Sequence, residues 1–543
     1  MRTTLLCLVG AVTSSVVACS SGTPEPNPAS GGTANAGTGG KQEAGGGSGS
    51  GGKAAGNGGS VGPADGGAAG SGAGGDPPVS GCGDLSLDED VSLGSFNCDR
   101  FVWSDEACKP RSAALVRVGG GYLREYRYQF EGKTRVITGT GAAGHNGFGY
   151  TVNHFNDTAT VGQDGPGSFK PIFVGKYHAI YEYRSSPQIN GQAVPVTQHW
   201  FFASGRSHPV LAITYDMSEL EADSLNADIR TPYGDMAWDG DENADKTVVS
   251  GVAWGDRYKF ITTSEPLTMN STWDYTEPNL VPYVIEWAKA SDAEMGIVQT
   301  QTQAQHEGGG YWFYPNWGKT SANQTQTDGQ VGNMTPTWNW TYQLNQYELC
   351  IEDPSCVDNP TGSHRVAWGM NYGALGGDAQ GPAGTYAAYG DDKRLLGHPY
   401  QSYSVIVVLS PHSASPTFAE VEQIEITQAT TLSTSKGSVT QELPGGVGRT
   451  DLVPLEPPGW DARYGVFSLT AEEGQVAFEL DTPGLHSPVF AIEESDSEPQ
   501  RVMFDGTELE SGRDYLGSFD EVTGRAWLTL RKNVSGRHSI SVE

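Results

Sequence analysis

The chain has 543 residues and a formal net charge of −31 at pH 7. Acidity of this size argues against nucleic acid or an anionic lipid surface as the main partner, because both would repel the protein. All 13 Trp, 23 Tyr and 17 Phe lie beyond residue 81. The remaining chain of about 460 residues therefore has ample side chains for large cores, and we expect two domains in it.

The N-terminus begins with a short apolar run, Leu5–Ala18. The run is too short to span a bilayer, and polar low-complexity chain follows at once, so residues 1–18 are predicted to be a removable signal peptide rather than a buried core helix. The residues at the predicted cut, Val16-Val17-Ala18-Cys19, resemble the lipobox of bacterial lipoproteins. The resemblance implies that Cys19 is lipidated and becomes the new N-terminus. A following Ser-Ser pair, here Ser20-Ser21, is compatible with sorting to the outer membrane in such lipoproteins. We therefore expect a lipid-anchored protein of the bacterial outer membrane, exposed at the surface.

Residues 19–80 consist almost entirely of Gly, Ala, Ser, Pro, Thr and Asn. Such a chain cannot bury enough apolar surface to offset its conformational entropy, so it is predicted to be disordered. A flexible chain of about 60 residues has a root-mean-square reach of roughly 40–45 Å. We interpret this segment as a tether that holds a folded domain clear of the membrane.

Five cysteines follow the tether in two groups, Cys82, Cys98 and Cys108 in the first and Cys350 and Cys356 in the second. A compartment outside the cytoplasm permits disulfides. The second group is close enough in sequence to close a small loop, and we predict a disulfide there. The first group is predicted to supply another bridge and to leave one thiol over, with the pairing open. Zinc is the rival use, but the chain has no Cys-x-x-Cys pair.

Residues 81–410 have a mainly β pattern, rich in β-branched and aromatic residues between Gly, Pro, Asn and Ser. Two segments have helical signals instead. Ser218–Ile229 starts with a capping-box pattern, and Pro282–Ala290 has Pro at its start. The predicted strands are Ala114–Val118, Tyr122–Phe130, Ala179–Tyr183, His199–Phe202, Val210–Tyr215 and Ser402–Leu409.

A Pro- and Ser-rich break after Ser410 separates a second region, residues 411–543. Short predicted strands recur there at the regular spacing of a β-sandwich. They are Glu422–Thr427, Tyr464–Leu469, Gln475–Leu480, Val489–Ile492, Gln500–Phe504, Ala526–Arg531 and Ser539–Val542. The whole chain beyond the tether is predicted to be all-β. A large β-sandwich or super-sandwich is expected first, followed by a smaller C-terminal β-sandwich module.

Aromatic residues are concentrated in the middle of the chain, above all in residues 308–340, where they alternate with Asn, Gln, Thr and Gly. This mixture suits a sugar-binding groove, because ring faces pack on the C–H face of a pyranose while amides and hydroxyls pair with its hydroxyls. Packing in an ordinary core is the alternative for each single ring. The candidate sugar-binding residues are Trp254, Trp312, Trp317, Trp338 and Trp340.

An acidic segment offers oxygen side chains at every second position, at Asp239, Asp241, Asn243 and Asp245. A loop of that spacing can surround Ca²⁺ with hard ligands, so calcium is the candidate cofactor. The segment resembles the first half of an EF-hand loop, but Ala244 and Ser250 stand where that loop has Gly and a bidentate Glu. An irregular calcium loop and a solvated acidic turn both remain open.

Four histidines lie beside charged or glycine-rich sequence: His199, His208, His306 and His398. Histidine can act as a general base near neutral pH, and His306 and His199 are the first candidates. Tyr233 is the candidate acid, and Arg230 can clamp a substrate carboxylate through two hydrogen bonds. This combination suits β-elimination at a uronic acid, where the proton beside the carboxylate must be removed.

At the level of the fold, a large β-sandwich followed by a smaller β-module is similar to secreted carbohydrate-active proteins. The resemblance implies a polysaccharide or glycan as partner, and the leading hypothesis is a lyase that cleaves acidic, uronate-containing glycans. A glycoside hydrolase using the carboxylates Glu307 and Asp235 is an alternative. A non-catalytic glycan-binding or adhesion lipoprotein with the same aromatic residues is a second alternative, and a cell-surface structural protein with no small ligand is a third.

Overall fold

The computed structural model describes residues 82–117, 121–138, 147–155, 158–161, 167–189, 192–216, 219, 227–238, 251–255, 281, 283–288, 292–300, 330–331, 342–345, 365–370, 372–375, 400–441 and 457–543. All of them belong to one compact unit, Asp76–Glu543. The predicted signal peptide, tether and lipidated Cys19 lie outside the described residues, and so do Cys350 and Cys356.

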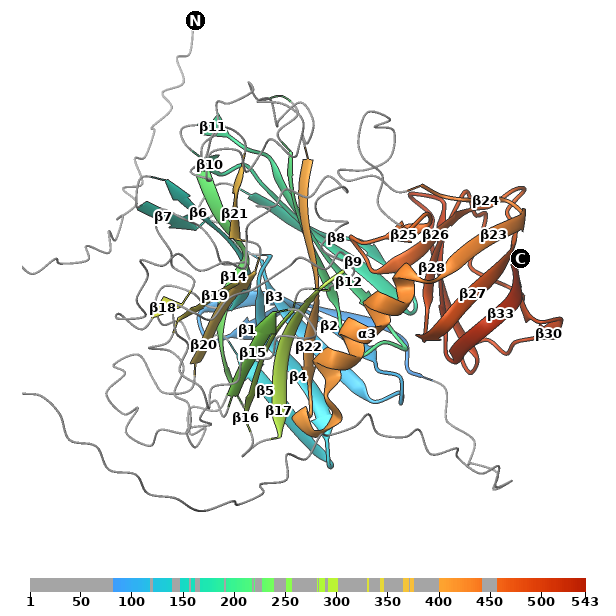
Figure 1. The fold of residues 1–543 in the computed structure, drawn as a ribbon, viewed down its shortest axis with the longest axis horizontal. Coiled ribbons are helices and arrows are strands. Elements are labelled where there is room, and N and C mark those ends of the chain that lie inside the picture. Colours follow the sequence, from blue (N-terminus) through green and yellow to red (C-terminus); the bar gives the residue numbers. More distant parts are fainter. Residues whose placement is uncertain are drawn as a thin grey trace, which may run out of the picture. The chain divides into compact units, whose positions relative to one another are not determined.

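Two large antiparallel sheets form the first part of this unit (Figure 1). The 12-stranded sheet has the order β1 (Ser86–Leu93), β2 (Phe96–Ser104), β3 (Pro110–Val116), β4 (Leu123–Phe130), β5 (Lys133–Thr138), β14 (Ala227–Trp238), β20 (Arg365–Met370), β19 (Tyr342–Asn345), β18 (Gln330–Val331), with β6 (Phe148–Phe155), β7 (Thr158–Val161) and β21 (Tyr372–Leu375) off this path. The 8-stranded sheet has the order β15 (Gly251–Gly255), β16 (Tyr283–Ala288), β17 (Ala293–Gln299), β22 (Tyr400–Ser410), β13 (Val210–Asp216), β12 (Val196–Ala203), β9 (His178–Ser185), β8 (Gly167–Val174). A short hairpin pairs β10 (Gln188–Ile189) with β11 (Gln192–Ala193).

The two large sheets pack face to face through alternate residues of their strands, as the period of two in a strand requires. On β12, the indole of Trp200 donates to the carbonyl of Gly121 at 2.6 Å, across to the 12-stranded sheet. Phe202 on the same strand stacks on Phe101 of β2 with ring centroids 4.7 Å apart. Gly121 has φ +80°, and a Cβ there would lie 2.6 Å from the Cβ of Tyr183, so only glycine fits this close approach.

The C-terminal residues form two smaller sheets. One has the order β23 (Thr431–Lys436), β27 (Val476–His486), β33 (Asn533–Val542), β29 (Val502–Phe504), β30 (Thr507–Glu508). The other has the order β24 (Ser438–Val439), β26 (Val466–Thr470), β28 (Val489–Glu493), β32 (Arg525–Leu530), β31 (Tyr515–Asp520), with β25 (Trp460–Asp461) beside β26. Phe478 and Phe490 join the two sheets with ring centroids 5.1 Å apart. The all-β class and the smaller C-terminal β-sandwich are therefore confirmed.

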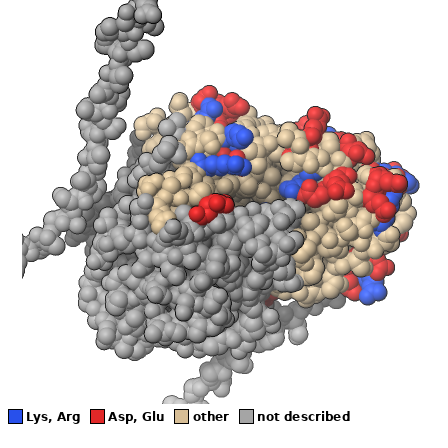
Figure 2. Space-filling model, turned by 90° about the horizontal axis from the view of Figure 1, so that it is seen from above, with Lys and Arg blue, Asp and Glu red and all other residues tan. Residues whose placement is uncertain are grey.

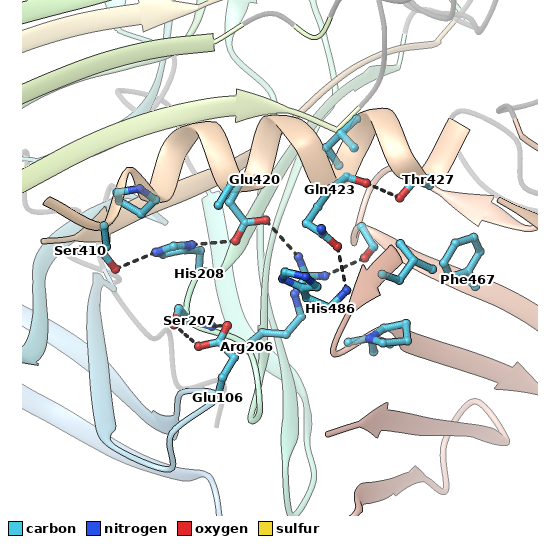
Figure 3. Close-up of a pocket in the computed structure, with 18 of the residues that line it drawn as sticks. Glu106, Arg206, Ser207, His208, Ser410, Glu420, Gln423, Thr427, Phe467 and His486 are labelled. Atoms are coloured by element: carbon cyan, nitrogen blue, oxygen red, sulfur yellow. Dashed lines mark hydrogen bonds and ion pairs between the residues drawn. The ribbon is translucent and has the colours of Figure 1, made fainter. Parts of the chain in front are cut away.

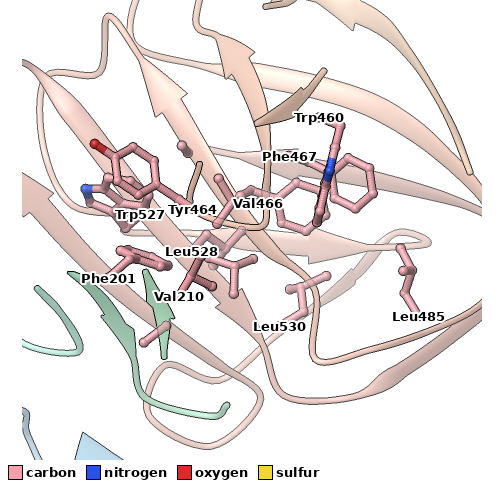
Figure 4. Close-up of a cluster of buried hydrophobic side chains, with 14 of the residues drawn as sticks. Phe201, Val210, Trp460, Tyr464, Val466, Phe467, Leu485, Trp527, Leu528 and Leu530 are labelled. Carbon is pink, nitrogen blue, oxygen red and sulfur yellow. The ribbon is translucent and has the colours of Figure 1, made fainter. Parts of the chain in front are cut away.

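The 8-stranded sheet and the C-terminal module share one hydrophobic core (Figure 4). Phe201 of β12 points away from the 12-stranded sheet and packs on Trp527 of β32, with ring centroids 4.9 Å apart. His178 of β9 is fully buried on the same face, between Ser518 and Thr529 of the module. We call this boundary, where β9 and β12 meet the module, the junction.

The helix α3 (Pro416–Gln428) follows the short 3₁₀ helix η6 (His412–Ala414) and lies on the outer face of the 8-stranded sheet (Figure 1). Val421, Ile424 and Thr427 are buried at the three-residue spacing of a helix face. The predicted strand Glu422–Thr427 was therefore wrong, because a proline at the first helical position and this buried stripe favour a helix. Gly296 of β17 permits the contact, since a Cβ there would lie 2.1 Å from Oγ1 of Thr417.

The two predicted helices are not helical where they are described. Pro282–Ala290 contains the strand β16, whose residues Tyr283, Ile285 and Trp287 are buried. Burial of every second residue outweighed the helix-start signal of the proline. The end of Ser218–Ile229 lies in the strand β14, and the rest of that segment is outside the described residues except Glu219.

Cys82 and Cys108 form a disulfide with an S–S distance of 2.10 Å, and Cys98 is the buried free thiol. The expectation of one bridge and one spare thiol in this group is therefore confirmed. Burial, opposed by Arg124, raises the pKa of Cys98 to about 11. The thiol is thus neutral and unreactive at physiological pH.

Acidic and basic side chains are interspersed over the described part of the face in Figure 2. Arg537 of β33 and Asp481 of β27 form one exposed ion pair of the C-terminal module. Within the described ranges, no helix is both long and apolar enough to cross a membrane.

Candidate functional site

Most predicted site residues lie outside the part of the chain that the structure describes. These are the candidate base His306, the sugar-binding candidates Trp312, Trp317, Trp338 and Trp340, and the calcium candidates Asp239, Asp241, Asn243 and Asp245. No cluster of three or more His, Cys, Asp or Glu that could hold a metal ion occurs among the described residues. Arg230 and Tyr233 lie on β14 and Trp254 lies on β15, where the structure describes the backbone.

The strand β14 places the candidate clamp and acid inside the 12-stranded sheet, with neighbouring strands on both sides. Arg230 pairs with Val152 of β6 and with Tyr372 of β21. Tyr233 pairs with Tyr150 of β6 and with Gly369 of β20. Directly paired positions of antiparallel strands have Cα atoms about 4.5–5.5 Å apart. Arginine and several tyrosines therefore occupy adjacent positions of one sheet.

The same register brings in a histidine that the sequence reasoning missed. His154 of β6 pairs with Asp228, two residues before Arg230 on β14. The pairing of β6 with β14 shifts between Arg230 and Tyr233, and such bulges often lie next to active sites, where they redirect side chains. Sequence spacing alone could not reveal this neighbour, because His154 is separated from β14 by more than 70 residues of chain.

His199 lies elsewhere, on β12 of the 8-stranded sheet. Its neighbours Gln198 and Trp200 bond to the carbonyls of Gly149 and Gly121, towards the 12-stranded sheet, so His199 points the opposite way. Its ring lies against Tyr464 of the C-terminal module, with ring centroids 5.7 Å apart. The structure therefore does not bring His199 together with Arg230 and Tyr233.

Both nitrogens of His199 have partners. Nε2 lies 3.1 Å from Oε2 of Glu182, the residue directly opposite on β9, and Nδ1 lies 2.8 Å from the hydroxyl of Tyr464. Burial would raise the pKa of Glu182, but hydrogen bonds from His199 and Arg184 outweigh it and lower this pKa to about 2. Nε2 donates to this ionised carboxylate, and in the neutral imidazole Nδ1 accepts from the tyrosine hydroxyl. These hydrogen bonds connect β9, β12 and the C-terminal module at the junction.

A pocket of about 240 Å³ lies beside the junction, between the β12–β13 turn, α3 and the C-terminal module (Figure 3). Its polar side includes Glu106, Arg206, His208, Glu420 and Gln423. Figure 3 shows Phe467 on the other side, where the wall is apolar. Several polar groups therefore converge on this cavity. Among them, the sequence analysis named only His208 as a candidate.

The centre of this polar side is the contact between His208 and Glu420. Nδ1 of His208 lies 2.8 Å from Oε1 of Glu420, and its Nε2 lies 3.0 Å from Oγ of Ser410. Arg206 lies 3.6 Å from the other oxygen of Glu420. Burial would raise the pKa of Glu420, but the hydrogen bond from His208 and the nearby charge of Arg206 lower it. Glu420 is therefore a largely buried carboxylate whose ionised form is favoured by these partners.

No protein-family model matches the chain, and no curated protein matches it. Among solved structures, it is similar to the α-N-acetylgalactosaminidase NagBb from Bifidobacterium bifidum in complex with GalNAc, with 9% identity and a TM-score of 0.28 over 56% of this chain and 35% of that chain. It is also similar to a GalM/aldose epimerase homologue from C. elegans, with 7% identity and a TM-score of 0.27 over 55% of this chain and 96% of that chain. The chain thus spans about a third of the length of the first. Likeness this distant carries no argument about function.

Proposed function

We propose that the protein acts on polysaccharide, as a lyase that cleaves uronate-containing glycans by β-elimination. The observation that supports this most directly is the register of β14, in which Arg230 and Tyr233 have Tyr150 and Tyr372 as paired neighbours and His154 close by. A carboxylate clamp, a phenolic acid and a histidine base are the groups that this reaction needs. The aromatic, amide-rich sequence of residues 308–340 adds a surface suited to sugar rings.

In the proposed reaction, Arg230 pairs with the uronate carboxylate and stabilises the negative charge that develops when the neighbouring C5 proton leaves. A histidine takes that proton, with His306 the first candidate and His154 the second. The C4–O bond breaks, a C4=C5 double bond forms, and Tyr233 protonates the departing glycosidic oxygen. His199 is less suited to the role of base, because Glu182 and Tyr464 engage both its nitrogens.

The reaction is tested by incubating the purified protein with a panel of uronate polysaccharides. Ultraviolet absorbance from unsaturated sugars is the expected result, and Arg230→Ala should abolish it. Arg537→Ala is the matched control, since Arg537 is an exposed arginine on β33 paired with Asp481. New reducing ends without absorbance would refute the lyase and identify a glycoside hydrolase, with Glu307 and Asp235 as the carboxylates to vary. Binding without any product would instead identify a non-catalytic glycan-binding or adhesion protein.

The proposed setting is the bacterial outer membrane, to which a lipid on Cys19 attaches the protein. Radiolabelled palmitate fed to expressing cells should enter the protein, and Cys19→Ala should prevent both labelling and recovery in the outer-membrane fraction. Cys98→Ala serves as the control, because that thiol is buried in the folded region. Equal labelling of both variants would contradict the anchor.

A further inference from the structure

The pocket beside the junction has no part in the proposed elimination, yet it has the features of a ligand site. Its volume of about 240 Å³ is far above the roughly 10–15 Å³ that a single water molecule needs in the same measure. That is room for a sugar ring. Its walls come from segments far apart in the sequence, namely the loop at Glu106, the turn at Arg206, the helix α3 and the β27–β28 turn at His486.

The polar side retains both donors and acceptors after its internal bonds are counted. The Glu106 carboxylate accepts from the backbone N–H and the hydroxyl of Ser207, which leaves further lone pairs. The guanidinium of Arg206 donates to the carbonyl of Gly465 at 3.0 Å and lies near Glu420, so it also has N–H groups in excess. A ligand whose groups both donate and accept, such as a ring bearing several hydroxyls, matches this set.

The opposite wall is aromatic and aliphatic. Trp460 and Phe467 meet edge to face, with centroids 5.2 Å apart, and Leu485 and Val489 continue the same wall. The indole N–H of Trp460 donates to the carbonyl of Thr300 at 3.0 Å, so the ring is fixed in place. A rigid apolar wall opposite a polar one is the arrangement that accepts the C–H face of a pyranose while its hydroxyls are paired on the other side.

The charged side chains that line the pocket limit the class of ligand that it can bind. The pocket has two carboxylates, Glu106 and Glu420, one guanidinium, Arg206, and two imidazoles, His208 and His486. Arg206 and His208 already lie beside Glu420, and Glu106 is exposed at the rim. A uronate would place a further negative charge near Glu106, and the two carboxylates would repel each other. We propose that the pocket binds a single neutral hexose unit of a glycan, away from the uronate-cleaving site.

Such a site would hold the polysaccharide on the protein while a different segment of the same polysaccharide reacts. This inference goes beyond the proposed function, because binding of a neutral hexose needs no turnover. A ligand of about 12 non-hydrogen atoms in a site of ordinary efficiency binds with a Kd on the order of 1 mM. Saturation-transfer NMR of the whole protein with methyl glycosides of glucose, galactose and mannose measures affinities in this range.

We expect saturable binding of at least one neutral methyl hexoside, and at least tenfold weaker binding of methyl glucuronide. Ala419→Trp should abolish the hexoside signal, because Ala419 lines the pocket from the exposed side of α3 and a bulky ring there fills it. Glu422→Trp is the matched control, since Glu422 is exposed on the same helix but does not line the pocket. Glu106→Gln should reduce the difference in affinity between the neutral hexosides and methyl glucuronide, because it removes the negative charge at the rim of the pocket.

Three results would overturn the proposal: no binding up to about ten times the expected Kd, equal binding by the Ala419→Trp and Glu422→Trp variants, or a glucuronide bound as tightly as the hexosides. Measuring the cleavage of uronate polysaccharide tests the elimination independently of the hexose site. If the protein cleaves uronate polysaccharide, Ala419→Trp should still cleave short uronate oligosaccharides at the normal rate. If it cleaves none, the elimination fails while the hexoside measurement still decides the pocket.

Discussion

Acidification should weaken the junction through one residue, His178. The imidazole is fully buried, with Nδ1 3.0 Å from Oγ of Ser518 and Nε2 2.8 Å from Oγ1 of Thr529. Burial lowers the pKa of His178 from its ordinary value of 6.5 to about 3. The folded protein therefore holds this ring neutral, whereas the unfolded chain takes up a proton below pH 6.5. The stability that depends on the neutral ring is fully present above pH 6.5 and is lost as the pH falls towards 3.

The size of the effect follows from linkage. Between pH 7.5 and pH 5, the unfolded histidine gains its proton and the folded one does not, which lowers the free energy of unfolding by about 2 kcal/mol. This window lies above the range in which Glu182 titrates, because its pKa is lowered from 4.5 to about 2. His538, which is partly exposed, acts in the opposite direction, since a hydrogen bond to Asp505 raises its pKa and its protonated form favours the folded state.

Urea unfolding of the whole chain at pH 7.5 and pH 5 measures this loss. Tryptophan fluorescence reports on the junction, because the ring of Trp527 lies 6.2 Å from that of His178. In the His178→Gln variant, which cannot titrate, the drop in unfolding free energy between the two pH values should shrink by about 2 kcal/mol. His538→Gln should not reduce the drop. An unchanged drop in His178→Gln would refute the reasoning.

Three further outcomes are expected. Gly296→Ala should lower the melting temperature and cost about 1–3 kcal/mol of stability, because the new Cβ would clash with Thr417. Gly484→Ala is the control, since no atom lies within 4 Å of the new Cβ. Equal melting temperatures of the two variants would contradict the close packing of α3. Cys82→Ser should destabilise the folded region by about 2–4 kcal/mol, since it opens a bridge with a sequence separation of 26, and thermal unfolding with and without reductant checks this. If residues 239–245 bind calcium, a chelator should lower the melting temperature, and an unchanged curve in excess chelator would remove the ion.

The sequence was sufficient to predict the fold class, because strand signals are local. Strands such as β4, β12, β13 and β22 were found from β-branched and aromatic runs between turn residues. The errors arose where local signals disagreed. The proline of Pro282–Ala290 suggested a helix start, although every second residue from Tyr283 is buried in a sheet. The predicted strand Glu422–Thr427 lies in α3, where the spacing of the buried residues Val421, Ile424 and Thr427 matches a helix face.

The candidate sites depend on pairing between distant segments, which local patterns do not encode. The neighbours of Arg230 on β6 and β21 lie far from it in the chain. The same holds for His208, whose partner Glu420 is 212 residues away. Sequence reasoning could therefore name single residues with suitable chemistry. It could not say that His199 would contact Tyr464 of the C-terminal module, 265 residues further on.

The shared core determines which fragments of this protein can be produced. A chain cut after β22 would leave Phe201, Val210 and Ile180 of the 8-stranded sheet without the side chains that bury them in the intact protein. The isolated C-terminal strands would likewise present Trp527 to water. Either half on its own should aggregate, so recombinant expression, domain swaps and crystallisation trials need a boundary at the tether and not at residue 410.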